Sequence, residues 1–320
     1  MPCGRITGTG SGLPERVMTN ADMEKLVDTS DQWIRERTGI TQRHIASDEE
    51  TTSSLAETAA RNALSAAGLE PGDLDMIVMG TTTPDQLFPN AAVLLQSRLG
   101  IGGIPAFTLE AACTSFLYAL SVADKFIRCG EARRILVVGA EKLSPLVDWT
   151  DRSTCVLFGD GAGAVVLEAD DEPGVIATRL HADGQYRDLL YFPAGVGRNF
   201  PRVSDSRIQM KGNEVFRVAV KSLGEASRAI LEDQGIGRDD IDWFIPHQAN
   251  VRIIHATARK LDMPAERIVI SVDQHGNTSA ASIPLALDLA VRDGRIQRGQ
   301  LLLMTSFGAG FTWGAALVRM

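Results

Sequence analysis

The chain has 320 residues, of which 44% are hydrophobic and 22% are charged, and its formal net charge is −8 at pH 7. This length is sufficient for a large core and indicates either two packed units or one large α/β domain. The acidic balance argues against a nucleic-acid-binding protein, because a phosphate backbone requires clustered Lys and Arg.

The four cysteines lie far apart, with no CxxC pair and no histidine at ligand-like spacing. This pattern argues against a disulfide scaffold and against a structural zinc site, so we expect no metal. No signal-peptide pattern opens the chain, and no apolar run approaches the roughly 18 residues that a membrane span needs. We therefore expect a cytoplasmic protein without a membrane segment.

Strand-like runs alternate with helix-like stretches along the chain, which predicts an α/β fold. Glycine and proline residues separate these runs, as expected at element boundaries. The predicted elements in chain order are a helix over 54–67, strands over 76–79, 135–138 and 165–167, a helix over 216–231, and strands over 243–245 and 301–304.

The two halves of the chain resemble each other. Four pairs of segments match in the same order: Arg61–Leu69 with Arg228–Ile236, Asp73–Val78 with Asp240–Ile245, Cys113–Ser115 with Asn277–Ser279, and Ile135–Gly139 with Leu301–Thr305. The offset is 228 − 61 = 167 for the first two pairs, 277 − 113 = 164 for the third and 301 − 135 = 166 for the fourth. We infer two copies of one α/β unit, over 1–170 and 171–320.

Cys113 follows two alanines and precedes a helix-like run. One interpretation is a buried structural cysteine. The other places the thiol on a strand-to-helix turn, where the helix N-terminus favours the thiolate that attacks carbonyls. The duplication favours the second interpretation, because it pairs Cys113 with Asn277 and makes the two positions face each other.

His247 and Asn277 are the other candidate reactive residues. His247 follows the predicted strand over 243–245, at the carboxyl edge where α/β sheets bind ligands; a solvated loop histidine is the alternative. Asn277 suits a turn with a helix cap, or a neutral amide donor that holds an enolate oxygen. We expect His275 to have a structural role.

Three glycine-rich stretches were considered as ligand-binding loops. Gly8–Gly12 is followed by Pro14 and no helix opens there, which argues against a dinucleotide site. The stretch Phe158–Ala164 lacks the Lys-Ser/Thr of a phosphate-binding loop and suits close packing instead. Phe307–Phe311 has the composition to present backbone N–H groups in an oxyanion hole.

Several long segments resemble the beta-ketoacyl-acyl carrier protein synthase III family of the thiolase superfamily. They span nearly the whole chain: Ile6–Glu15, Asp28–Ile40, Phe158–Ala164, Met210–Phe216, Pro246–Asn250, His275–Ser282 and Gly310–Arg319. The resemblance implies a thiolase-like duplicated α/β unit with α-β-α-β-α layers, in which the N-terminal half carries the nucleophilic cysteine. It also implies a homodimer.

By this resemblance, Cys113, His247 and Asn277 form a catalytic triad, and the backbone N–H groups of Cys113 and Ala309 form an oxyanion hole. The implied reaction is a decarboxylative condensation of a short acyl-CoA, such as acetyl-CoA, with malonyl-acyl carrier protein, through an acyl-Cys113 thioester. This reaction starts type II fatty-acid synthesis. No cofactor is implied, since coenzyme A is part of a substrate and phosphopantetheine arrives on the carrier protein.

The resemblance also implies binding residues. The coenzyme A channel comprises Thr29, Trp33, Arg37, Arg152, Gly212 and Asn213, with Trp33 and Arg152 on either side of the adenine. Phe88 shapes the primer pocket across the dimer interface. The carrier protein docks on Gln248, Ala249, Asn250, Val251, Arg252, Arg259 and Lys260, whose cations suit an acidic partner.

The chain departs from the family pattern in two places. Thr114-Ser115 stands where small residues are expected, and Ala309 stands where a third consecutive glycine is common. The two hydroxyl groups either alter the acyl pocket or bond locally. The alternative functions are an acyltransferase or secondary-metabolite ketosynthase on the same fold, and a non-catalytic scaffold partner.

Overall fold

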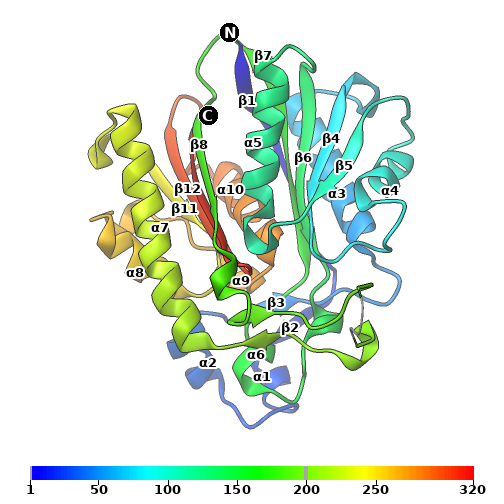
Figure 1. Ribbon diagram of the computed structural model, residues 1–320, viewed down its shortest axis with the longest axis vertical. Helices are drawn as coiled ribbons and strands as arrows, with labels where there is room; N and C mark the ends of the chain where they lie inside the picture. Colours follow the sequence, from blue (N-terminus) through cyan, green and yellow to red (C-terminus); the bar gives the residue numbers. More distant parts are fainter. Residues whose placement is uncertain (1, 198–200) are drawn as a thin grey trace.

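The computed structural model describes residues 2–197 and 201–320 (Figure 1). A five-stranded sheet contains, in spatial order, β1 (Cys3–Gly12), β7 (Gly161–Asp170), β6 (Arg134–Glu141), β4 (Met76–Gly80) and β5 (Ala106–Leu109). Strands β4, β5 and β6 are parallel, whereas β7 is antiparallel to both of its neighbours. The predicted strands over 76–79, 135–138 and 165–167 all lie within this sheet.

A second sheet repeats the same arrangement with β11 (Trp243–Pro246), β12 (Leu301–Gly308), β13 (Thr312–Arg319) and β8 (Val175–Ala182). Here β11 and β12 are parallel, and β13 is antiparallel to both β12 and β8. A single bridge between Phe244 and Ile268 stands at the position that β5 occupies in the first sheet. The two sheets therefore share one topology.

Helices form three layers around these sheets. Helices α3 (Thr52–Ala67) and α4 (Ala91–Arg98) cover the outer face of the first sheet, and α7 (Gly212–Gln234) packs on the outside of the second with α8 (Val251–Lys260) against it. Helices α5 (Ser115–Arg128) and α10 (Ser282–Arg292) lie between the sheets. This α-β-α-β-α order confirms the predicted fold class.

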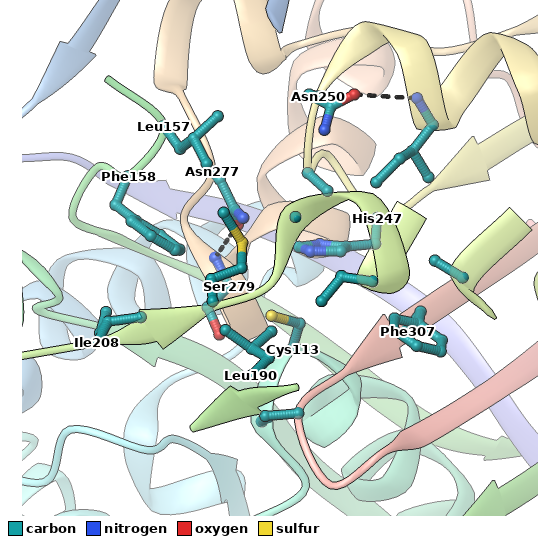
Figure 2. A pocket seen from close by; sticks show the side chains of 18 of the residues that line it. Cys113, Leu157, Phe158, Leu190, Ile208, His247, Asn250, Asn277, Ser279 and Phe307 are labelled. Atoms are coloured by element: carbon teal, nitrogen blue, oxygen red, sulfur yellow. Dashed lines mark hydrogen bonds between the residues drawn. The ribbon is translucent and has the colours of Figure 1, made fainter. Parts of the chain in front are cut away.

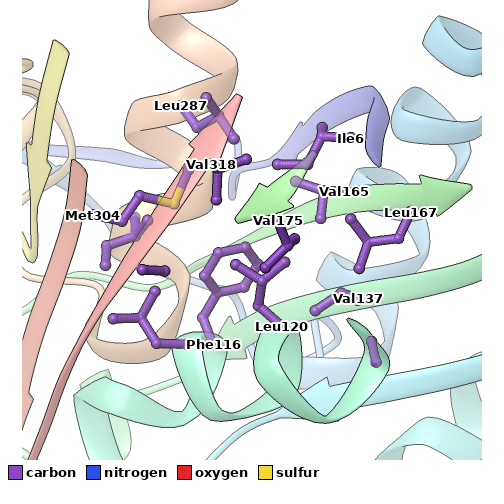
Figure 3. Close-up of a cluster of buried hydrophobic side chains, with 14 of the residues drawn as sticks. Ile6, Phe116, Leu120, Val137, Val165, Leu167, Val175, Leu287, Met304 and Val318 are labelled. Carbon is purple, nitrogen blue, oxygen red and sulfur yellow. The ribbon is translucent and has the colours of Figure 1, made fainter. Parts of the chain in front are cut away.

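The two central helices are apolar on most of their surface because sheets contact them on both sides. Phe116 and Leu120 of α5 and Leu287 of α10 are at most 1% exposed, and they pack with Val165 of the first sheet and Val318 of the second (Figure 3). This cluster joins the two sheets into one core.

Shorter elements gather at one end of the molecule, at the bottom of Figure 1. They comprise α1 (Asn20–Met23), α2 (Asp31–Thr38), α6 (Arg152–Cys155), α9 (Val272–His275), and the strand pairs β2 (Val17–Thr19) with β3 (Gln42–His44) and β9 (Leu190–Tyr191) with β10 (Gln209–Met210). The Ser30 hydroxyl caps α2 by accepting from the N–H of Trp33, and Gly39 ends it with a φ of +79°.

Both predicted helices extend beyond their predicted bounds for local reasons. Helix α3 begins at Thr52 rather than residue 54, because the Thr51 hydroxyl accepts from the N–H of Ser54. Helix α7 covers 212–234 rather than 216–231, and it ends where Gly235 adopts a φ of +62°.

The structure corrects the register of the internal repeat. Ala112 and Ser279 both have a φ of +49°, and each begins a short 3-10 turn, η2 (Ala112–Thr114) and η8 (Ser279–Ala281), that leads directly into α5 or α10. The offset is therefore 279 − 112 = 167 here as well. The predicted pairing of Cys113 with Asn277 is wrong: Cys113 corresponds to Ala280, and Asn277 corresponds to Glu110.

The strands show the same offset. Met76 pairs with Ile135 and Trp243 pairs with Leu302, so Ile135 corresponds to Leu302 rather than to Leu301. The two-residue match of Thr114-Ser115 with Thr278-Ser279 gives the wrong register, because a short polar motif carries less register information than the backbone geometry of a turn.

Candidate active site

Cys113 lies in the η2 turn at the N-terminal end of α5. Its side chain is partly buried and lines a large cavity. Burial raises the pKa of this thiol to about 12; the Ser279 hydroxyl acts in the opposite direction, while the carboxyl groups of Glu141 and Glu110 raise the pKa further. The thiol therefore has to lose a proton before it attacks.

His247 directly follows β11, as predicted, and its backbone N–H donates to the carbonyl of Thr305 over 2.7 Å. The side chain is 5% exposed, and Nδ1 lies 2.6 Å from Oγ of Ser282. That oxygen also accepts the backbone N–H of Gln248 over 3.3 Å. When the Ser282 hydroxyl donates to Nδ1, the neutral ring carries its proton on Nε2.

The charge state of His247 follows from its burial, which lowers the pKa of the imidazole to about 3. At neutral pH the ring is uncharged. With the proton on Nε2, His247 is a hydrogen-bond donor and not a base at that nitrogen.

Asn277 lies between Gly276 and the η8 turn, and its backbone is bound on both sides. Its N–H donates to Leu157 over 2.8 Å and its carbonyl accepts from Gly159 over 3.0 Å. The side-chain Oδ1 accepts the N–H of Ser279 over 2.9 Å (Figure 2). With Oδ1 occupied in this way, the Nδ2 hydrogens are the part of the amide that can serve a ligand.

One cavity of about 870 Å³ brings the three residues together. Cys113, His247 and Asn277 all line it, and Figure 2 shows their side chains converging from different elements. The cavity continues to Trp33 and Arg37. Its size is within the range of small-molecule sites.

The predicted coenzyme A residues divide into two groups. Trp33, Arg37, Gly212 and Asn213 line the cavity, whereas Thr29 and Arg152 are not among its lining residues. The guanidinium carbon of Arg152 is nevertheless 4.8 Å from the centre of the Trp33 ring, and that of Arg37 is 5.3 Å away. Both guanidinium groups therefore lie close to the Trp33 ring.

The end of β12 lies against Cys113. A Cβ atom on Gly308 would come within 2.7 Å of the Cys113 backbone nitrogen, so this approach requires glycine. Ala309, the next residue, lines the cavity.

The hydroxyl groups of Thr114 and Ser115 both donate to backbone carbonyls, Ser115 to a neighbour in the chain and Thr114 to the other half of the molecule. Thr114 donates to the carbonyl of Thr312 over 3.2 Å, and Ser115 donates to that of Ala112 over 2.7 Å. Both residues are fully buried and neither lines the cavity. Neither of these two hydroxyl groups is therefore exposed in the cavity.

The predicted docking residues differ in exposure. Arg252, Arg259 and Lys260 are exposed on α8, and Ala249 and Asn250 line the cavity. Val251 is half-buried, and Oδ1 of Asn250 caps α8 by accepting the N–H of Ile253.

Gln248 does not fit the predicted docking role. It is 1% exposed, and its amide bonds to the backbone of Pro246, Val269, Ser271 and Val272. Gln248 therefore stabilises the loop that follows β11 and is not available for contact with a carrier protein.

Phe88 lies away from the cavity of its own chain. It is 83% exposed and is not among the lining residues. An aromatic ring this exposed suits a contact with a second molecule.

The sequence interpretation missed Glu141, Ser279 and Ser282. Glu141 ends β6 with no solvent exposure and accepts the hydroxyl of Ser279. The available signal was an acidic residue at the end of the otherwise apolar run Ile135–Ala140. Nothing in the sequence distinguished Ser279 and Ser282 from other serines.

Within residues 2–197 and 201–320, no group of three or more His, Cys, Asp or Glu side chains is arranged to hold a metal ion. In the same residues, no helix has the length and apolar character required to cross a membrane.

Two related sheets enclosing a pair of central helices, with a cysteine at the start of one helix, define the thiolase-like class of proteins. Comparison with known proteins narrows this class. Residues 107–184 match the family described as 3-oxoacyl-[acyl-carrier-protein] synthase III, and residues 231–320 match its C-terminal part. The beta-ketoacyl-[acyl-carrier-protein] synthase III of Thioalkalivibrio sulfidiphilus is 60% identical over 321 residues and covers 100% of both chains. The chain therefore belongs to the 3-oxoacyl-[acyl-carrier-protein] synthase III family.

Solved structures agree with this assignment. The 3-oxoacyl-[acyl-carrier-protein] synthase III of Aquifex aeolicus superimposes with a TM-score of 0.94 at 50% identity, over 99% of this chain and 100% of that one. A priming beta-ketosynthase from the R1128 polyketide biosynthetic pathway gives a TM-score of 0.95 at 36% identity, over 99% of this chain and 96% of that one.

Proposed function

We propose that this protein condenses a short acyl-CoA, such as acetyl-CoA, with malonyl-acyl carrier protein to give 3-ketoacyl-acyl carrier protein, coenzyme A and carbon dioxide. This is the step that starts type II fatty-acid synthesis. The observation that carries the proposal is the convergence of Cys113, His247 and Asn277 on one cavity that reaches from the thiol to Trp33. The family assignment supplies the reaction class.

In the first half-reaction, Sγ of Cys113 attacks the thioester carbonyl of the acyl-CoA, and coenzyme A leaves. The backbone N–H groups of Cys113 and Ala309 hold the negative oxygen of the tetrahedral intermediate. The close approach of Gly308 to Cys113 supports this pairing. The product is an acyl-Cys113 thioester, which divides a difficult condensation into two easier steps.

In the second half-reaction, malonyl-acyl carrier protein enters and loses carbon dioxide. The thioester oxygen becomes an enolate, which accepts hydrogen bonds from Nε2–H of His247 and Nδ2–H of Asn277. The carbanion then attacks the carbonyl carbon of acyl-Cys113. Decarboxylation produces the carbanion without a strong base, so this mechanism uses neither a metal nor a redox cofactor.

The ends of the cavity have separate binding roles in this proposal. Trp33 and Arg152 stack on the adenine of coenzyme A, with Thr29, Arg37, Gly212 and Asn213 along the channel. A base between Trp33 and Arg152 needs two contact layers of about 3.5 Å each. The guanidinium carbon of Arg152 is 4.8 Å from the centre of the Trp33 ring, which is less than two such layers require. The Arg152 side chain therefore moves outward when the adenine enters.

The carrier protein docks on the exposed cations of α8, and the exposed Phe88 ring inserts into a second copy of this chain in a homodimer. A division into halves over 1–170 and 171–320 is supported by the two sheets, whose strands come from residues 3–170 and 175–319. A cytoplasmic location and the absence of a cofactor stay predictions.

The test is the mass of the intact protein after exposure to acetyl-, butyryl- and longer acyl-CoA, followed by malonyl-acyl carrier protein. We expect one acyl adduct, which is absent in Cys113→Ser and is discharged with release of carbon dioxide.

Other outcomes would indicate the alternatives. An adduct that moves to another acceptor without decarboxylation would identify an acyltransferase. Discharge only onto a carrier protein of secondary metabolism would identify a priming ketosynthase like the R1128 enzyme. No adduct from any acyl-CoA would contradict the covalent mechanism and favour a scaffold.

A further inference from the structure

Glu141 is a buried carboxyl group for which the proposed mechanism has no role. It ends β6 and has no solvent exposure. Its Oε2 accepts the hydroxyl groups of Thr82 and Thr83 over 2.8 and 2.7 Å. Its Oε1 accepts the hydroxyl of Ser279 over 3.2 Å. Among the described residues, no Lys or Arg nitrogen lies within 4.0 Å of this carboxylate, so its burial is costly.

The fold does not require an acid at this position. The repeat relates Glu141 of β6 to Gly308 of β12 and relates Ser279 to Ala112. The equivalent place in the other half is thus filled by glycine and alanine, which pack beside the Cys113 backbone. Only one of the two related positions carries a carboxyl–hydroxyl pair. Packing alone therefore does not explain Glu141.

The active site also needs a group that accepts a proton. Cys113 begins as a neutral thiol, because burial raises its pKa to about 12. His247 is poorly suited to accept that proton, since its Nδ1 is bound to Ser282 and burial lowers its pKa to about 3. An asparagine amide is not a base. The remaining titratable groups that act on the Cys113 thiol are Glu141 and Glu110.

Ser279 connects the thiol to one of these two carboxyl groups. Its hydroxyl donates to Oε1 of Glu141 over 3.2 Å. Ser279 and Cys113 both line the cavity (Figure 2), and the Ser279 hydroxyl acts on the pKa of the Cys113 thiol. Glu110 has no such connection; its Oε1 accepts the backbone N–H of Ala112 over 2.9 Å. The order thiol, hydroxyl, carboxylate is the order that a proton relay requires.

We propose that Glu141 accepts the Cys113 proton through the Ser279 hydroxyl when the acyl group is transferred. The S–H proton moves to the Ser279 oxygen while the Ser279 hydroxyl proton moves to Oε1 of Glu141. The sulfur electron pair forms the new S–C bond, and the C–S bond of the acyl-CoA breaks. Coenzyme A leaves as a thiolate and takes a proton from solvent. This role rests on the proposed function, since it concerns the same acyl transfer.

The second half-reaction restores the starting state. When the carbanion attacks acyl-Cys113, the Cys113 thiolate is released, and Glu141 returns its proton through Ser279. The one proton that the overall condensation consumes is the solvent proton taken up by coenzyme A, so the protons balance over a complete turnover.

The pKa of Glu141 suits both the acceptance of the Cys113 proton and its return. Burial raises its pKa to about 7, against the hydrogen bonds from Thr83, Thr82 and Ser279 that lower it. A group with a pKa near the working pH both accepts and returns a proton readily. The neighbouring Lys142 does not face it, because its Nζ donates to the carbonyls of Ser47 and Glu50.

The test compares Glu141→Gln with the wild-type enzyme in two assays: alkylation of Cys113 by iodoacetamide between pH 6 and 9, and acylation by acetyl-CoA in single turnover. We expect both rates to fall about 100-fold near pH 7.5. In the wild-type enzyme we expect both rates to rise as the pH passes 7, because Glu141 then loses its proton. In Glu141→Gln we expect this rise to be absent. The sign of the change separates the relay from a simple charge effect. If the Glu141 carboxylate acted only by its charge, it would raise the pKa of the Cys113 thiol, and its removal would accelerate alkylation.

Two further variants separate the relay from a structural effect. Ser279→Ala retains Glu141 and interrupts the connection; alanine tolerates this backbone, since Ala112 adopts the same φ of +49°. We expect Ser279→Ala to lower both rates as much as Glu141→Gln does. The variant that combines the two substitutions should show no further decrease. Glu110→Gln is the matched carboxyl control, and we expect no decrease in its alkylation rate.

Several results would overturn the relay: a faster or unchanged alkylation rate in Glu141→Gln, additive losses in the double variant, or an unaltered pH profile in folded Ser279→Ala. Alkylation uses no acyl-CoA. A wild-type enzyme that is alkylated with the expected profile but is never acylated would therefore contradict the proposed function while leaving the proton route intact.

Discussion

At the scale of single residues, the site depends on how each polar group is held by its neighbours. His247 and Asn277 present donors to the cavity because Ser282 occupies Nδ1 of the histidine and the Ser279 N–H occupies Oδ1 of the asparagine. Each contact directs a group that could otherwise face either way. The two serines thus determine which atoms a substrate meets.

Ser282→Ala tests this orientation of His247. Removing the hydroxyl leaves Nδ1 without its partner, and a buried unpaired group costs about 1–3 kcal/mol. We expect kcat for malonyl decarboxylation to fall about tenfold, with the rate of acylation from acyl-CoA retained. Rapid-quench measurement of each half-reaction checks this. An equal loss in both half-reactions would instead indicate a general structural effect.

At the scale of elements, the η2 turn and the end of β12 position Cys113 together. Gly308→Ala would place a Cβ 2.7 Å from the Cys113 nitrogen and force the turn and the strand end apart. A displacement of about 1 Å costs on the order of 100-fold in rate, so we expect acylation to fall by that factor. Single-turnover acylation measures it. Gly72→Ala, whose Cβ would meet nothing within 4 Å, is the control and should retain full activity.

Helix α8 carries the proposed docking surface. Arg259 and Lys260 are exposed and lie outside the cavity lining, so reversing their charge affects the partner and not the chemistry. For Arg259→Glu/Lys260→Glu, we expect KM for malonyl-acyl carrier protein to rise about tenfold and to lose its salt dependence. Steady-state kinetics at two ionic strengths test this. A parallel loss of acylation by acyl-CoA would count against a docking role.

At the scale of the whole molecule, buried histidines link stability to pH. Burial, with a smaller effect from His44, lowers the pKa of His275 to about 4, whereas an unfolded histidine has a pKa of about 6.5. Between these values the unfolded chain binds more protons, so the folded state loses stability as the pH falls from 6.5 towards 4. At pH 5 this group accounts for a loss of about 2 kcal/mol relative to pH 8.

His275→Gln removes that dependence. We expect the difference in unfolding free energy between the wild-type protein and the variant to shrink by about 2 kcal/mol between pH 8 and pH 5. Urea unfolding at the two pH values measures it, and His247 contributes equally to both proteins. A difference that stays the same at both pH values would show that His275 has the same pKa in the folded and unfolded chain, which contradicts the prediction.

The fold class could be predicted from the sequence because buried strands and helices have recognisable patterns of apolar residues. Apolar runs such as Ile135–Val138 mark strands covered on both faces, and the repeat of Arg61–Leu69 at Arg228–Ile236 records the duplication. Cys113, His247 and Asn277 were also found, because they stand at element boundaries and in family motifs.

The register of the repeat and the partners of the reactive groups depend on tertiary structure. Cys113 corresponds to Ala280 because the backbone makes the same turn at Ala112 and at Ser279, with the same φ. These two residues differ in type, so the sequence does not mark the turn. Glu141 meets Ser279 only because the central helices bring the two halves together. Local periodicity reports whether a side chain is buried; which group it meets there depends on contacts between residues far apart in the chain, and those form only when the sheets pack.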